Sequence, residues 1–260
     1  MNTRMSWNSI VLACGFFLLM GSSSVLVQAF AEEAMNQHDH ATHQQVEGTQ
    51  ESGSAGASMQ HHHQHRAPIL PPAEDKAYSE LNHQIAGVFV LFAGGFALLA
   101  ASGSPRLAWA QYSWPIFFFL MGLFLFVRHD PESWPWGPLP LWEAIHDPQV
   151  LQHVLFTVIV LGIGVIEWLR HRGTLTNPVW GLIFPVLAVS AAAMLFLHKH
   201  GEGPVAEKIY RHHAIMATAG ILAMVAKVLD EAKLLKTNIG GYVWSALMIF
   251  IGFMLLIYRE

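Results

Sequence analysis

Residues 151–169 read LQHVLFTVIVLGIGVIEWL, an apolar run that contains a single charged side chain, Glu167. Its length matches the roughly 20 residues that a helix needs to cross about 30 Å of hydrocarbon. Five similar runs occur at about 84–102, 110–127, 179–197, 213–229 and 239–258. Because an open strand would leave backbone groups unpaired in lipid, each run predicts a helix. The sequence therefore predicts an all-α integral membrane bundle of about six transmembrane helices.

The composition supports this interpretation. Apolar residues make up 53% of the chain and charged residues 12%, whereas soluble domains carry about 25% charged residues. The net charge of −4 is small and indicates no nucleic-acid partner. Glycines within the runs are expected to allow close helix contacts, at Gly94, Gly95, Gly162, Gly164 and Gly220.

Residues 1–31 are typical of a secretory signal peptide. Arg4 precedes an apolar stretch, and Ala29-Phe30-Ala31 fits a cleavage site with small residues. The alternative is an uncleaved anchor helix. Cys14 is the only cysteine, so cleavage would leave a chain without thiols. Any site for a soft metal would then use methionine and histidine.

Residues 32–82 are predicted to form a disordered extracytoplasmic tail, followed by the transmembrane domain at 83–260. The tail lacks the apolar residues that could offset its ordering entropy. Clustered imidazoles bind transition metals, so the tail is predicted to capture metal ions, although an inert polar tail is the alternative. Its histidines are His38, His40, His43, His61, His62, His63 and His65.

A cleaved signal places the tail outside, and the loops near 103–109, 170–178 and 230–238 then face the cytoplasm. The excess of positive charge in these loops is slight, so the orientation depends mainly on the signal. The chain has 16 histidines, and on this topology all except His171 lie on the outer face.

Histidines beside transmembrane segments are candidates for function, because burying them without a partner is unfavourable. Several hydrophobic runs begin or end with histidine on the outer face, and a methionine shares a helix face with two of them. Imidazole together with thioether favours copper, particularly Cu(I) over harder ions, although Cu(II) remains open. The candidate metal ligands are His83, His153, His198, His200, His212, His213 and Met216.

The loop between the second and third runs is rich in proline and tryptophan, and it is predicted to form a rigid lid at the membrane interface. Asp130, Glu132 and Trp134 are candidates for orienting histidines or covering the site. Asp130 could instead cap a turn, and Asp147 is expected to cap the third helix.

At the opposite face, Glu167 and Lys227 lie near the ends of the third and fifth runs. Two arrangements are open: the two side chains could form an ion pair, or Lys227 could extend to the interface. As a pair they could contribute to an inner exit route for an ion.

The stretch Asp130-Pro131-Glu132-x-Trp134-Pro135-x-Gly137, followed by Asp147-Pro148-x-Val150-x-Gln152-His153, resembles the copper-resistance D membrane proteins. The later His198-x-His200 and His212-His213 pairs are similar to the C-terminal region of that family. The resemblance covers roughly residues 107–231. This chain is shorter than the usual members and has its own histidine-rich leader.

The resemblance implies a multi-pass protein of the bacterial inner membrane that handles copper in the periplasm, with its tail in that compartment. It implies roles for Asp130, Glu132, Trp134, His153, His198 and His200. Either transport or delivery to a partner is compatible, and that partner could be a periplasmic copper-binding protein or a larger membrane complex.

Two other functions stay open. In the first, histidines on two helices, such as His153 and His213, hold haem b for electron transfer. In the second, the chain is a structural or assembly subunit whose histidines are incidental. No nucleophile with a neighbouring base is recognisable, and no pair of carboxylates is placed for acid–base catalysis, so we do not expect an enzyme.

Overall fold

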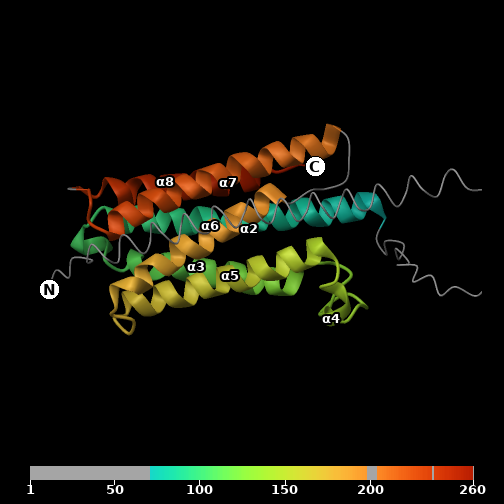
Figure 1. Ribbon diagram of the computed structural model, residues 1–260, viewed down its shortest axis with the longest axis horizontal. Helices are drawn as coiled ribbons and strands as arrows, with labels where there is room; N and C mark the ends of the chain where they lie inside the picture. The colour runs from blue at the N-terminus through green and yellow to red at the C-terminus, as the bar shows by residue number, and fades with distance from the viewer. Residues whose placement is uncertain (1–70, 198–203, 236, 260) are drawn as a thin grey trace, which may run out of the picture. The chain divides into compact units, whose positions relative to one another are not determined.

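The computed structural model describes residues 71–197, 204–235 and 237–259. The long helices in this part (Figure 1) are α2 (Pro72–Ala101), α3 (Ala110–Arg128), α5 (Pro148–His171), α6 (Ile183–Leu197), α7 (Pro204–Glu231) and α8 (Ile239–Leu256). Shorter elements are α4 (Leu141–Ala144) and two 3₁₀ helices, η1 (Pro105–Leu107) and η2 (Pro178–Leu182). The expected signal peptide and the tail up to residue 70 lie outside the described residues, as do His198 and His200.

Six helices within the described residues are long and apolar enough to cross a membrane, judged by length and composition. The predicted fold class is therefore confirmed, and the chain is a multi-pass membrane protein. The outward surfaces carry large exposed apolar side chains, such as Phe92, Leu123 and Val158. Exposure of this kind is expected where lipid surrounds the helices.

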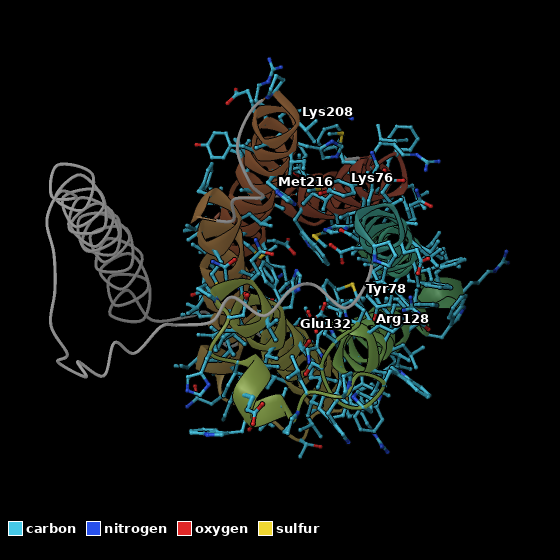
Figure 2. The ribbon with its side chains drawn as sticks, turned by 90° about the vertical axis from the view of Figure 1, so that its right-hand side faces the viewer. Lys76, Tyr78, Arg128, Glu132, Lys208 and Met216 are labelled. Atoms are coloured by element: carbon cyan, nitrogen blue, oxygen red, sulfur yellow. The ribbon has the colours of Figure 1, made fainter. Side chains whose placement is uncertain are left out.

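The long helices are arranged as a closed ring. Each helix packs against the next one in the chain, and α2 closes the ring by packing against α8. Figure 2, which looks along the helices, shows this order. The α5–α6 contact is slighter than the others, whereas α2 and α8 pack most extensively. The ring therefore has one weak seam, between α5 and α6.

Two close helix contacts depend on glycine, as predicted. A Cβ at Gly94 would lie 2.8 Å from the backbone nitrogen of Ile249 in α8, and one at Gly164 would lie 2.6 Å from that of Phe119 in α3. The expectation for Gly95 is wrong, since a Cβ there would meet nothing within 4 Å. Gly162 and Gly220 have only ordinary van der Waals neighbours.

Several helices begin earlier than the hydrophobic runs. The first helix begins at Pro72 and not near 84, so the last residues of the expected disordered tail are helical. Proline at its first position and the acidic residues Glu74 and Asp75 in its first turn favour a helix start there. Similarly, α7 begins at Pro204, which places His212 and His213 more than two turns inside the helix.

The interior of the ring combines small side chains on α2 with large ones on the facing helices. Ala93 and Ala97 are buried among Trp114, Phe184 and Trp244, all members of one hydrophobic cluster. Polar side chains are also buried, among them His213 toward one end of the bundle and Glu167 toward the other.

Candidate functional site

The ring has two ends with different chemistry. The starts of α2 and α7 and the connection that follows α3 lie at one end, which we call the histidine end. The connections that follow α2, α5 and α7 lie at the other, which we call the charged end. The sequence predicts that the charged end faces the cytoplasm.

At the histidine end, three imidazoles surround Tyr258, and we call these four residues the tyrosine group. The His83 ring stacks on Tyr258 with centroids 4.1 Å apart, and His212 and His213 lie 5.4 and 5.8 Å from the same ring. Tyr258 has an exposed fraction of 0% and His213 of 1%. The tyrosine therefore joins α2 and α7, which are not neighbours in the ring.

Backbone carbonyls orient two of these imidazoles. His83 Nδ1 lies 2.8 Å from the carbonyl oxygen of Ser79, and His212 Nε2 lies 2.9 Å from that of Met254. Because a carbonyl only accepts hydrogen bonds, each of these nitrogens donates. The neutral His83 ring then carries its lone pair on Nε2, the arrangement typical of metal-binding histidines.

His213 is the imidazole that comes nearest to His83 within this group. Their ring centroids are 6.1 Å apart. When one ion binds two imidazole nitrogens, each at about 2 Å, the centroids of the two rings lie at most roughly 6 Å apart. The observed separation lies at this upper limit. Met216 is buried on α7, one turn after His213.

The remaining described histidine candidate, His153, belongs to a separate loop group with His129 and Ser133. His153 Nδ1 donates to the carbonyl oxygen of His129 at 3.0 Å. The His129 ring donates from Nδ1 to Phe126, and its Nε2 lies 3.2 Å from Ser133 Oγ. These bonds fix the end of α3 against α5 and the lid.

A polar contact links the start of α2 with the end of α3. Asn82 donates to the carbonyl oxygen of Arg128 at 3.0 Å and accepts from Arg128 Nε at 2.8 Å. The Arg128 guanidinium lies 4.3 Å from the centre of the Tyr78 ring. Figure 2 labels both residues. The helical residues before 83 therefore have a structural role that hydropathy does not reveal.

The predicted single histidine cluster is thus divided between two groups in the described residues. Within residues 71–197, 204–235 and 237–259, no three His, Cys, Asp or Glu side chains are close enough together to hold a metal ion. The two candidates from different helices whose rings approach each other there are His83 and His213, and Met216 lies one turn after His213 on α7.

The lid candidates shape the loop that follows α3. Asp130 accepts a hydrogen bond from the Glu132 amide at 2.8 Å, so it caps the turn. Burial raises the pKa of Asp130, although hydrogen bonds from the Glu132 and Ser133 amides oppose that effect. Trp134 packs its ring edge to face with Phe126 at 5.7 Å, and its peptide bond to Pro135 is cis.

Asp147 has the capping role that the sequence predicted. It precedes α5 and accepts from the amides of Gln149 at 2.7 Å and Val150 at 3.4 Å. Its carboxylate therefore stabilises the helix that carries His153, because it satisfies amides that have no partner within the helix.

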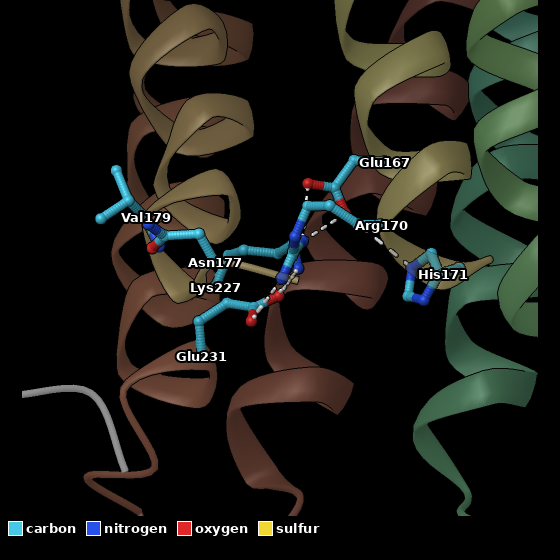
Figure 3. A network of polar contacts seen from close by, with 7 residues as sticks. All are labelled: Glu167, Arg170, His171, Asn177, Val179, Lys227 and Glu231. Atoms are coloured by element: carbon cyan, nitrogen blue, oxygen red, sulfur yellow. Dashed lines mark hydrogen bonds and ion pairs between the residues drawn. The ribbon is translucent and has the colours of Figure 1, made fainter. Parts of the chain in front are cut away.

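At the charged end, four ionic side chains form a charged network of Glu167, Arg170, Lys227 and Glu231 (Figure 3). Arg170 Nη1 lies 2.8 and 2.7 Å from the two oxygens of Glu167, and Arg170 Nη2 lies 2.9 Å from Glu231 Oε2. Lys227 Nζ donates to Glu231 Oε1 at 2.6 Å. Glu167 and Lys227 thus belong to one network but are joined through Arg170 and Glu231.

Lys227 does not extend to the interface. Its exposed fraction is 4%, and its ammonium lies 5.2 to 5.9 Å from the ring centres of Trp114, Phe184 and Trp244. Aromatic faces attract a cation, and the carboxylate of Glu231 neutralises it. The interior therefore holds the lysine as an ammonium group.

A cavity of about 340 Å³ opens beside this network. Its walls include Trp114 and Trp244, and its charged lining comes from Arg170, His171, Lys227, Asp230, Glu231 and Lys233. His171 Nε2 lies 3.8 Å from Glu167 Oε2. Space large enough for water molecules therefore lies close to the buried carboxylate of Glu167.

Sequence reasoning missed Tyr258, Arg170 and Glu231. Arg170 lies three residues after Glu167, and Glu231 lies four after Lys227, so helical spacing could have indicated both pairs. Both residues were placed at loop edges instead. Tyr258 follows the last helix, and no local pattern connects it with His83 across the chain.

No family model matches the chain, and neither the curated proteins nor the solved structures contain a protein that matches it. The resemblance to the copper-resistance D proteins therefore stays a prediction.

Proposed function

We propose that the chain is a copper-binding membrane protein that holds the ion at the histidine end through His83, His213 and Met216. The observation that carries this proposal is the approach of His83 and His213 inside the ring, with centroids 6.1 Å apart. These residues come from α2 and α7, which α8 separates in the ring. His213 is buried and His83 is partly buried, and imidazoles that meet across a membrane bundle are candidates for holding a shared ligand.

The donor set favours Cu(I). Thioether sulfur and imidazole nitrogen suit a soft ion, whereas zinc sites typically use four ligands. The described residues offer two imidazoles and one thioether here, a number that satisfies Cu(I). His198 and His200, together with His153, remain further candidates from the sequence.

In the proposed function, different parts of the chain have different roles. The histidines of the tail capture copper, the histidine end holds it, and the bundle stores it, passes it to a partner or conducts it. The location in a bacterial inner membrane and the partner, a periplasmic copper-binding protein or a membrane complex, are parts of the same proposal.

The test is the copper content of purified protein after loading with Cu(I) under reducing conditions. We expect about one tightly held copper per chain after deletion of residues 32–66. Replacing both His83 and His213 with alanine should remove it, and Met216→Leu should weaken binding while it keeps the side-chain volume. His146→Ala is the matched control, because His146 is exposed and bonded only to backbone carbonyls of its own segment.

Copper that survives the His83/His213 replacement would contradict the proposed ligand set. Loss of that copper in a His153/His198/His200 triple alanine variant would then move the site to those residues. Copper lost entirely with the tail would leave the bundle without a metal site and favour a structural or assembly role. The visible spectrum of the same samples reports on haem, since a Soret band would favour the electron-transfer alternative.

A further inference from the structure

The carboxylate of Glu167 is the most enclosed ionic group at the charged end. Its exposed fraction is 0%, and within the described residues the only donor that hydrogen bonds to it is Arg170 Nη1, which is shared between its two oxygens. Glu231, in contrast, binds both Arg170 and Lys227. Because removing a charge from water is costly, Glu167 is the carboxylate of this network that is easier to neutralise.

His171 connects this carboxylate with the cavity. Its side chain is 24% exposed and lines the cavity, and its Nε2 lies 3.8 Å from Glu167 Oε2. In the part of the chain that the structure describes, that nitrogen has no hydrogen-bond partner. The imidazole packs edge to face with Trp114 at 5.6 Å, which keeps it beside Glu167. An imidazole can accept a proton at one ring nitrogen and donate one from the other, so it can pass protons between two groups.

The ionic groups that face Glu167 come from two helices. They are Arg170 and His171 of α5, and Lys227 and Glu231 of α7. Asp230 and Lys233 also line the cavity. The sequences of η2, α6 and α8 contain no charged residue, and the charged residues of α2 and α3 lie at their histidine ends.

We propose that the charged end is a proton-binding site, in which His171 passes protons from the cavity to Glu167. His171 accepts a proton from a hydronium ion in the cavity, which becomes water, and the imidazole becomes an imidazolium. It then transfers the Nε2 proton to Glu167 Oε2, which becomes a neutral carboxylic acid while the imidazole returns to its neutral form. A small rotation of the imidazole or one bridging water closes the 3.8 Å gap.

Proton uptake changes the charge balance of the network. With both carboxylates ionised, the two acids balance Arg170 and Lys227. A neutral Glu167 leaves these two cations with Glu231 alone, so the interior gains one positive charge. A membrane protein that moves a cation can use such a change to couple the two ions. This inference does not depend on copper.

Infrared difference spectroscopy on the protein in lipid nanodiscs tests the site without copper. Acidification should produce a carbonyl band of a buried carboxylic acid, which Glu167→Gln should abolish and Glu167→Asp should shift. Glu207→Gln is the matched control, since Glu207 is exposed on α7, and it should leave the band unchanged. After a pH jump, His171→Asn should slow the appearance of the band about tenfold or more.

A band that persists in Glu167→Gln, or a wild type without any such band while it stays folded, would overturn the proposal. An unchanged rate in His171→Asn would remove His171 from the path and overturn the relay. Because none of these measurements contains copper, their failure is distinguishable from failure of the copper proposal.

Discussion

The two ends of the bundle satisfy their buried polar side chains in different ways. At the histidine end, imidazoles bond to backbone carbonyls and stack on Tyr258. At the charged end, side chains bond to one another, and Arg170 joins two carboxylates on different helices. The first arrangement orients groups that can receive a ligand, whereas the second neutralises charges that are already present.

The difference is also mechanical. The charged network spans the weak seam of the ring, because Arg170 of α5 reaches Glu231 of α7 past η2. A Cβ at Gly181 of η2 would lie 2.8 Å from Arg170 Nη2 and 3.1 Å from Glu231 Oε2, so the ion pair lies directly against that turn. At the histidine end the polar contacts are divided among separate pairs, such as Arg128 with Asn82 and Arg259 with Glu80, and in the described residues no single side chain there joins two carboxylates as Arg170 does.

The largest expected effect is therefore at the charged end. Arg170→Met removes the guanidinium that donates to Glu167, so the fully buried carboxylate loses this partner. The loss should lower the free energy of unfolding by about 3–5 kcal/mol. Unfolding in detergent by denaturant titration measures this change. Arg211→Met is the control, because its pair with Glu207 is exposed and should contribute less than about 1 kcal/mol. If Arg170→Met and Arg211→Met lowered the free energy of unfolding equally, the stability of the bundle would not depend specially on the charged network.

A smaller effect is expected at the histidine end. Tyr258→Leu removes the ring that stacks on His83 and contacts His213, and it should lower stability by about 2 kcal/mol. The loss should be independent of salt, because packing is not screened. Tyr210→Leu, at an exposed site on α7, serves as the control. A loss larger than that of Arg170→Met would reverse the comparison.

The fold could be predicted well from the sequence because each helix contains its own hydrophobic signal. Residues 151–169, for instance, need no tertiary information to be assigned as a span. Helix starts were less predictable, since Asn82 is held in α2 by Arg128, 46 residues later. Hydropathy cannot detect a polar turn that a distant partner stabilises.

The sites were predictable only in part, for a similar reason. His83 and His213 could be found because histidine near apolar runs is unusual, and they lie close together. That His153 instead bonds to the backbone of His129 depends on how the lid folds. Arg170 was missed because a charged residue at the end of a transmembrane span is normally assigned to the following loop.

The smallest effect concerns Asp130 in the lid, next to His129 and Glu132. Burial raises its pKa above the ordinary value of 3.8, so the folded lid binds the proton more tightly than the unfolded chain does. The stability that this proton gives is fully present below about pH 3.8 and is lost as the pH rises through the raised pKa. Asp130→Asn does not titrate and keeps an oxygen to accept from the Glu132 amide.

The variant should therefore match the wild type in acid and be more stable at neutral pH, by up to about 0.5 kcal/mol. Hydrogen exchange of the Leu139 amide, which donates to the carbonyl oxygen of Glu132, reports this locally. A variant lid that opens more readily at neutral pH would mean that the ionised carboxylate is itself stabilising. Asp130 would then act as a charged partner at the histidine end, and that end too would rely on charge.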